Sequence, residues 1–137
     1  MTYGNNWSNI PHSNIDSDLV NSVLRQRLYN NLLLIEQVLT KISDRKLTHQ
    51  ELIEEIIKIE KLIMNQIKRW NFRRRMLNIV MPENLKSALE TQLFQTKREK
   101  IKTRENTERD IAILEKELRQ LWKEVFELIT KLQFTNG

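Results

Sequence analysis

The stretch IAILEKELRQLWKEVFELITKL, residues 111–132, carries the clearest structural signal in the chain. Its apolar residues recur in steps of three and four without interruption, which is the heptad spacing of a coiled-coil seam. The seam residues are Ile111, Leu114, Leu118, Leu121, Val125, Leu128 and Leu132. Trp122, Phe126 and Ile129 form a second apolar face beside them. The stretch therefore predicts a long helix that packs along another helix.

The composition of the whole chain favours helices as well. Its 137 residues include only two glycines and two prolines, too few for the turns of a sandwich, a barrel or a doubly wound sheet. The absence of cysteine excludes disulfide frameworks, zinc ribbons and thiol nucleophiles. No uncharged run after residue 15 approaches the roughly 20 apolar residues that cross a bilayer. We expect a soluble, intracellular, all-α protein.

Two further helices are predicted upstream of the heptad. Apolar residues at helical spacing run from about 17 to 43, and the polar SDRK segment at 43–46 interrupts them. Thr48 and Glu51 then match a capping box, in which each side chain accepts a hydrogen bond from the backbone amide of the other residue. A second helix is therefore expected over about 49–80.

A chain reversal is expected at Pro82. Proline lacks an amide hydrogen and biases the preceding residue away from the helical region, so the second helix ends before it and a third begins at residue 83 and continues to about 133. The predicted architecture is an elongated helical hairpin or coiled coil of three long helices in one domain over 16–137, after a flexible polar tail at 1–15. A break near 103–107, which makes a four-helix bundle, stays open as the alternative.

The predicted hairpin leaves the end of the heptad uncovered. A helix over 49–80 covers the third helix only to about residue 115, and roughly 18 residues, about 27 Å, extend beyond it. Leaving these apolar side chains in water forfeits on the order of 10 kcal/mol, as much as the stability of a whole domain. We therefore expect a helical protein partner, either a second copy or a different chain, to bind the seam and its aromatic neighbours.

Two basic segments give the chain its net charge of +5. KRWNFRRR at 68–75 interleaves cations with aromatic residues, and KREKIKTR at 97–104 follows on the next helix. Cations in such numbers can neutralise phosphate or contact an acidic partner. The alternative is that they surround a buried Trp70 and pair with acids of a neighbouring helix or subunit. The candidate patch consists of Lys68, Arg69, Arg73, Arg74, Arg75, Lys97, Arg98 and Lys100.

No catalytic, metal-binding or cofactor-binding residues are predicted. The two histidines, His12 and His49, are isolated in the sequence and are expected to be exposed. The acidic pairs lie in helices without a neighbouring histidine, and neither a glycine-rich loop nor a catalytic motif occurs. We therefore expect a protein without enzymatic activity, cofactor or metal.

Several short motifs in the middle of the chain resemble those of the centromere protein H family. In order, they are KLIM at 61–64 with Trp70 after it, Leu77 and Ile79, the lysine- and glutamate-rich stretch 95–104, and ENTER at 105–109 before Ile111. The resemblance covers at most residues 55–130. It implies a coiled-coil subunit of the constitutive inner kinetochore, located in the nucleus at centromeres. It also implies two partners, centromere protein K and the HEAT-repeat subunit centromere protein I.

Three functional classes follow from the sequence. The first is a structural coiled-coil subunit of a multiprotein assembly, because the heptad needs a partner. The second is a basic, helical nucleic-acid-binding protein, which requires the cations at 68–75 to face solvent. The third is a self-contained four-helix bundle that acts as an adaptor.

Overall fold

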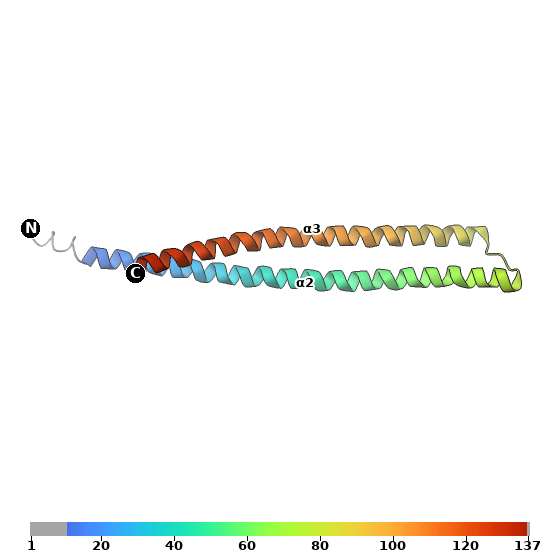
Figure 1. The fold of residues 1–137 in the computed structure, drawn as a ribbon, viewed down its shortest axis with the longest axis horizontal. Coiled ribbons are helices and arrows are strands. Elements are labelled where there is room, and N and C mark those ends of the chain that lie inside the picture. The colour runs from blue at the N-terminus through green and yellow to red at the C-terminus, as the bar shows by residue number, and fades with distance from the viewer. Residues whose placement is uncertain (1–10, 137) are drawn as a thin grey trace, which may run out of the picture. The chain divides into compact units, whose positions relative to one another are not determined.

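The computed structural model describes the backbone of residues 11–136 and the side chains of residues 17–133. Two helices make up nearly all of this part of the chain: α2 (Pro11–Leu77) and α3 (Glu83–Asn136) (Figure 1). The prediction of an all-α protein is confirmed for the described residues. None of their helices is long and apolar enough to cross a membrane. Of the tail expected at 1–15, residues 1–10 lie outside the described residues, and 11–15 belong to α2.

The predicted break at 43–48 is wrong, because α2 is helical throughout this segment. The two upstream helices expected from the sequence are therefore one, and the described chain has two helices instead of three. Thr48 is exposed within the helix instead of capping a new one. Arg45 follows buried Ile42 by three residues and precedes half-buried His49 by four, so the three side chains lie on one face of α2. Arg45 forms an ion pair with Asp110 of α3. Pairing with α3 thus continues past the polar segment and keeps it helical.

The predicted reversal at Pro82 is confirmed, with its details shifted by a few residues. Helix α2 ends at Leu77 because Asn78 adopts a left-handed backbone with φ of 53°, a conformation that asparagine tolerates better than most residues. The amide of Ile79 then donates to the carbonyl of Arg73 at 3.3 Å and so satisfies one of the last free carbonyls of the helix. At the start of α3 the amide of Lys86 donates to the carbonyl of Pro82 at 3.0 Å.

The alternative of a four-helix bundle within one chain is contradicted over the described residues. Helix α3 continues without interruption through 103–107, where the expected break would lie. Thr107 is buried there, and its hydroxyl donates to the carbonyl of Thr103 at 2.9 Å, a bond made within a helix. Threonine at this point therefore supports the continuous helix instead of starting a new one.

Packing divides the chain into two units. The terminal unit comprises Met1–Ile42 and Ile113–Gly137, and the hairpin unit comprises Ser43–Ala112. Each unit contains one segment of α2 and one of α3, which run antiparallel to each other. In Figure 1 the blue part of α2 and the red part of α3 form the terminal unit, and the green and yellow parts with the connection at 78–82 form the hairpin unit.

The terminal unit contains the main hydrophobic core of the described chain. Three residues of α2 pack against residues of α3, and half-buried leucines border them. The buried cluster consists of Ile35, Val38, Ile42, Leu121 and Val125, with Leu28, Leu114 and Leu118 at its edge. Burial of these side chains is the principal source of stability for this pair of helices.

The seam of the hairpin unit contains polar as well as apolar side chains on both helices. From α2 it receives isoleucines, of which Ile56 is buried and Ile53, Ile63 and Ile67 are half-buried. Helix α3 contributes half-buried Leu89 and Leu93 and then, from 96 to 107, polar side chains in steps of three and four, of which Thr96 and Thr107 are buried. The series on α3 is Thr96, Lys100, Thr103 and Thr107. This unit therefore gains less from apolar burial than the terminal unit does.

Candidate protein-binding surface

The predicted partner-binding seam at 111–132 is covered by the chain itself. Leu121, Val125 and Leu128 are buried, and the described chain supplies their partners from residues 24–42 of α2. The other seam residues are half-buried; they are Ile111, Leu114, Leu118 and Leu132. The expected overhang is therefore absent, because α2 continues through 43–48 and its N-terminal part lies along the heptad.

The aromatic residues beside the seam remain exposed. Trp122 retains 50% of its surface, Phe126 72% and Ile129 40%. Tyr29, Leu32 and Leu39 of α2 are also exposed, and Trp122 borders a hollow of about 360 Å³ together with these three residues. We call these six residues the apolar face: Tyr29, Leu32, Leu39, Trp122, Phe126 and Ile129.

Helical spacing places charged residues of both signs among the members of the apolar face. Arg25 and Glu36 fall on the same side of α2 as Tyr29 and Leu32, and Glu115 and Arg119 fall on the same side of α3 as Trp122. Glu36 lines the hollow beside Trp122. The apolar face is thus interspersed with two basic and two acidic side chains and carries no net charge.

The other side of the terminal unit is more polar. The Asn31 amide Nδ2 donates to Oε2 of Glu124 at 3.3 Å, which ties the two helices together on that side. Glu117 lies one heptad before Glu124 and is exposed. Ile113 is the most exposed large apolar side chain there, at 61%. Among the described side chains of this unit, the exposed aromatic residues lie on the apolar face.

The hairpin unit is held together by polar contacts across its seam. Lys100 Nζ donates to both carboxylate oxygens of Glu60, at 3.1 and 3.3 Å, and less than a quarter of either side chain is exposed. The Thr107 hydroxyl donates to a backbone carbonyl, which leaves its oxygen to accept from Nδ1–H of His49 at 2.8 Å. His49 is thus half-buried and bonded, which corrects the expectation that it is exposed.

The candidate basic patch is divided in the structure. On α2, Lys68 and Arg69 and the three arginines at 73–75 are exposed, and the Arg73 guanidinium lies 4.9 Å from the centre of the Trp70 ring, a cation–π contact. On α3, Lys97 and Arg98 are exposed. Lys100 does not belong to the surface, since it pairs with Glu60 inside the seam. The cations at 68–75 point in several directions around α2 because successive residues of a helix lie about 100° apart.

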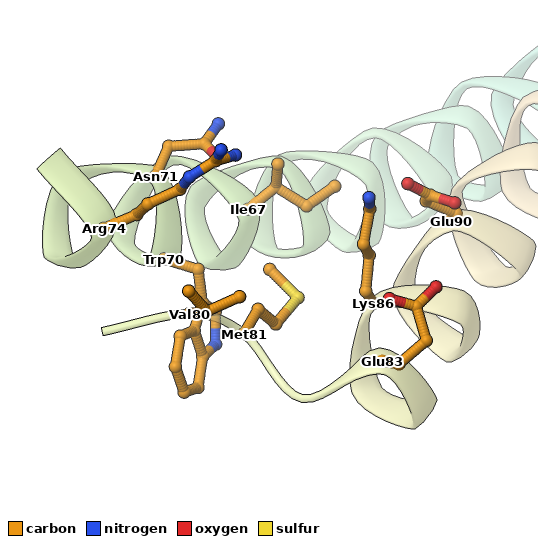
Figure 2. Close-up of a pocket in the computed structure, with 9 residues that line it drawn as sticks. All are labelled: Ile67, Trp70, Asn71, Arg74, Val80, Met81, Glu83, Lys86 and Glu90. Atoms are coloured by element: carbon orange, nitrogen blue, oxygen red, sulfur yellow. The ribbon is translucent and has the colours of Figure 1, made fainter. Parts of the chain in front are cut away.

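A hollow of about 310 Å³ lies where the hairpin unit reverses direction (Figure 2). Figure 2 shows Trp70, Val80 and Met81 at one side of it, and Lys86 with Glu83 and Glu90 at the other. Arg74 and Lys86 are balanced by the two glutamates, so the hollow offers no excess charge to an ion. Among the described residues, no group of three histidine, cysteine, aspartate or glutamate side chains could hold a metal.

Sequence reasoning found half of the apolar face and missed the other half. Trp122, Phe126 and Ile129 were recognised from their position beside the heptad. Of the three α2 members, Leu32 and Leu39 lie seven residues apart in the sequence, and this spacing is a signal for these two, whereas no spacing singles out Tyr29. No family model, curated protein or solved structure was found to match this chain.

Proposed function

We propose that this protein is a non-enzymatic structural subunit of a multiprotein assembly. Coiled-coil packing of α2 and α3 in the terminal unit forms a scaffold that presents the apolar face to another helical protein. The observation that carries this proposal is the exposure of Trp122 and Phe126 next to Tyr29 and Leu32 on one side of that unit. Large aromatic side chains on an otherwise charged chain mark a protein–protein interface.

The surface area of the chain supports a partner as well. The protein exposes 11038 Å², whereas a globular monomer of its mass exposes roughly 7,500 Å². The excess, about 3,500 Å², is larger than the roughly 1,000–2,500 Å² that each partner contributes to an obligate interface. A chain with so few buried apolar side chains gains stability when a partner covers part of this surface.

The resemblance of several motifs to those of the centromere protein H family supports the proposal of a particular assembly, the inner kinetochore. Under this proposal the protein is nuclear, localises to centromeres and binds centromere protein K. The motifs fall mainly in the hairpin unit, from KLIM at 61–64 to ENTER at 105–109. The apolar face belongs to the terminal unit, so the general proposal of an assembly subunit does not depend on the resemblance.

The test is to recover the tagged chain from cells of its source organism at its natural level. Three forms are compared: wild type, the double variant Trp122→Glu with Phe126→Glu, and the control Ile113→Glu. Ile113 is exposed in the same unit but lies outside the apolar face, so the control adds a carboxylate without touching the proposed surface.

The proposal expects defined proteins that are recovered with the wild type and the control and are lost with the double variant. If centromere protein K is among the recovered proteins and the chain localises to centromeres, the kinetochore assignment is supported. If other proteins are recovered, an assembly of a different kind is supported. If the same proteins are recovered with all three forms, or if the chain is recovered alone, the proposed role of the apolar face is overturned.

A second candidate function is nucleic-acid binding by the end of the hairpin unit. It is favoured by one observation: all residues from 71 to 80 are exposed, and Arg74 and Arg75 form no ion pair with the described side chains. The test is a titration of labelled duplex and single-stranded DNA and RNA at several salt concentrations. Binding that weakens steeply with salt and is abolished when Arg73, Arg74 and Arg75 are changed to glutamate supports it. Absence of binding at low salt refutes it.

A further inference from the structure

We infer that the apolar face binds the same face of a second copy of this chain, so that two terminal units form a four-helix bundle. The inference rests on the proposed function and identifies a second copy of this chain as the protein that covers the apolar face. Each copy contributes the same six residues, which makes the interface isologous, as in most homodimers. Three observations carry it: the area of the face, the distribution of charge between the two units, and the register of the two helices.

The exposed area of the face is sufficient for an interface between two copies. Its six side chains retain between 40% and 72% of their surface. With about 200 Å² for a fully exposed large side chain, the face presents roughly 600 Å² of mostly apolar surface per copy. This equals or exceeds the largest apolar patch of a typical monomer, and two such faces reach the size of a small specific interface, about 1,200 Å².

The distribution of charge permits self-association in the terminal unit and opposes it in the hairpin unit. The terminal unit has seven basic and seven acidic side chains, and the hairpin unit has sixteen basic and eleven acidic ones. The entire net charge of +5 therefore belongs to the hairpin unit. Two identical surfaces repel each other when they carry a net charge, so a second copy is favoured at the neutral unit.

The register of the two helices lets one pair of opposite charges on the face, Glu36 and Arg119, match between two copies. Asn31 bonds to Glu124, and the same antiparallel register places Glu36 at the height of Arg119 and Tyr29 at the height of Phe126 along the helix pair. A twofold axis parallel to the helices sets α2 of one copy against α3 of the other at the same height. Glu36 then faces Arg119 of the second copy, and Tyr29 faces Phe126 of the second copy.

The first test measures the mass of the purified full-length chain by light scattering and sedimentation over a wide range of concentrations. The wild type is expected to form a dimer of the 16.5 kDa chain. Trp122→Glu with Phe126→Glu is expected to raise the dimer dissociation constant at least about 100-fold, whereas Ile113→Glu is expected to leave it unchanged. Circular dichroism verifies that each variant remains helical.

A charge-exchange experiment identifies the second copy as the occupant. Arg119→Glu leaves the face with two net negative charges, and Glu36→Arg leaves it with two net positive charges. Each variant alone is expected to dimerise more weakly than the wild type, and an equimolar mixture is expected to recover the wild-type affinity by forming heterodimers. This comparison does not depend on the folding of the aromatic double variant.

The outcomes separate this inference from the proposed function. A wild-type chain that is monomeric at all concentrations overturns the inference. It is also overturned if the variant with Trp122→Glu and Phe126→Glu dimerises as tightly as the wild type, or if the mixture of the two charge variants does not recover the wild-type affinity. If the chain is monomeric and the wild type still recovers other proteins that the double variant loses, the assembly role stands and the occupant of the face is a different chain.

Discussion

Substitution of Ile35 by alanine is the most direct test of the core that joins the two ends of the chain. Ile35 is only 2% exposed and belongs to a cluster with Val38, Leu121 and Val125. The change removes three carbon atoms from this cluster, which costs about 2.4 kcal/mol of transfer free energy at 0.8 kcal/mol per carbon. A residual cavity adds to this cost, but a core one layer thick can partly collapse, so the expected loss of unfolding free energy is about 2.5–3.5 kcal/mol.

The assay is urea unfolding followed by circular dichroism, with all forms at the same chain concentration. The control is Leu33→Ala, which removes a similar amount of side chain from the same helix at a position that is 44% exposed. It is expected to cost about 1 kcal/mol or less, because much of the leucine already contacts water. If the two substitutions cost the same, residues 24–42 of α2 do not cover the heptad, and the account of the terminal unit fails.

Three features of the hairpin unit are tested by the same unfolding assay: the pair of Glu60 with Lys100, the bond of Thr107 with His49, and the backbone of Asn78. Glu60→Leu leaves Lys100 without its partner and is expected to cost about 1–3 kcal/mol, whereas the double change with Lys100→Leu is expected to be neutral or stabilising; a double variant as unstable as the single one contradicts the pairing. Thr107→Val is expected to cost about 1 kcal/mol, and much less in a His49→Leu background, since the bond between them is then already lost. Asn78→Gly is expected to be tolerated, and Asn78→Val to cost about 1–2 kcal/mol because of the left-handed backbone; equal effects refute that reason.

Local features of the sequence were sufficient for part of the fold. The heptad at 111–132 predicted a buried stripe on one helix, and the structure buries or half-buries every residue of it. Pro82 predicted the reversal, and α3 begins at Glu83 as expected. These predictions succeeded because helical spacing and the restricted backbone of proline act within a few residues and do not depend on what packs nearby.

The candidate site was only partly predictable. Trp122 and Phe126 were identified as apolar neighbours of the seam, but their spacing alone does not distinguish a buried side chain from an exposed one. The sequence placed Lys100 in a candidate basic surface, but in the structure it pairs with Glu60 of α2 inside the seam. Its partner is 40 residues away in the sequence, and no local pattern indicates such a pair.

The sequence by itself determined that the chain is helical, where it reverses and which stripe of α3 is buried. The tertiary structure decided what covers that stripe. A capping box at 48–51 predicted a break in α2, but the start signal of a helix is worth only about 1 kcal/mol. Continuous pairing with α3 from Ile42 through Arg45 to His49 outweighs it. Because α2 therefore continues, its own N-terminal part covers the heptad, and the surface left for a partner is the apolar face beside it.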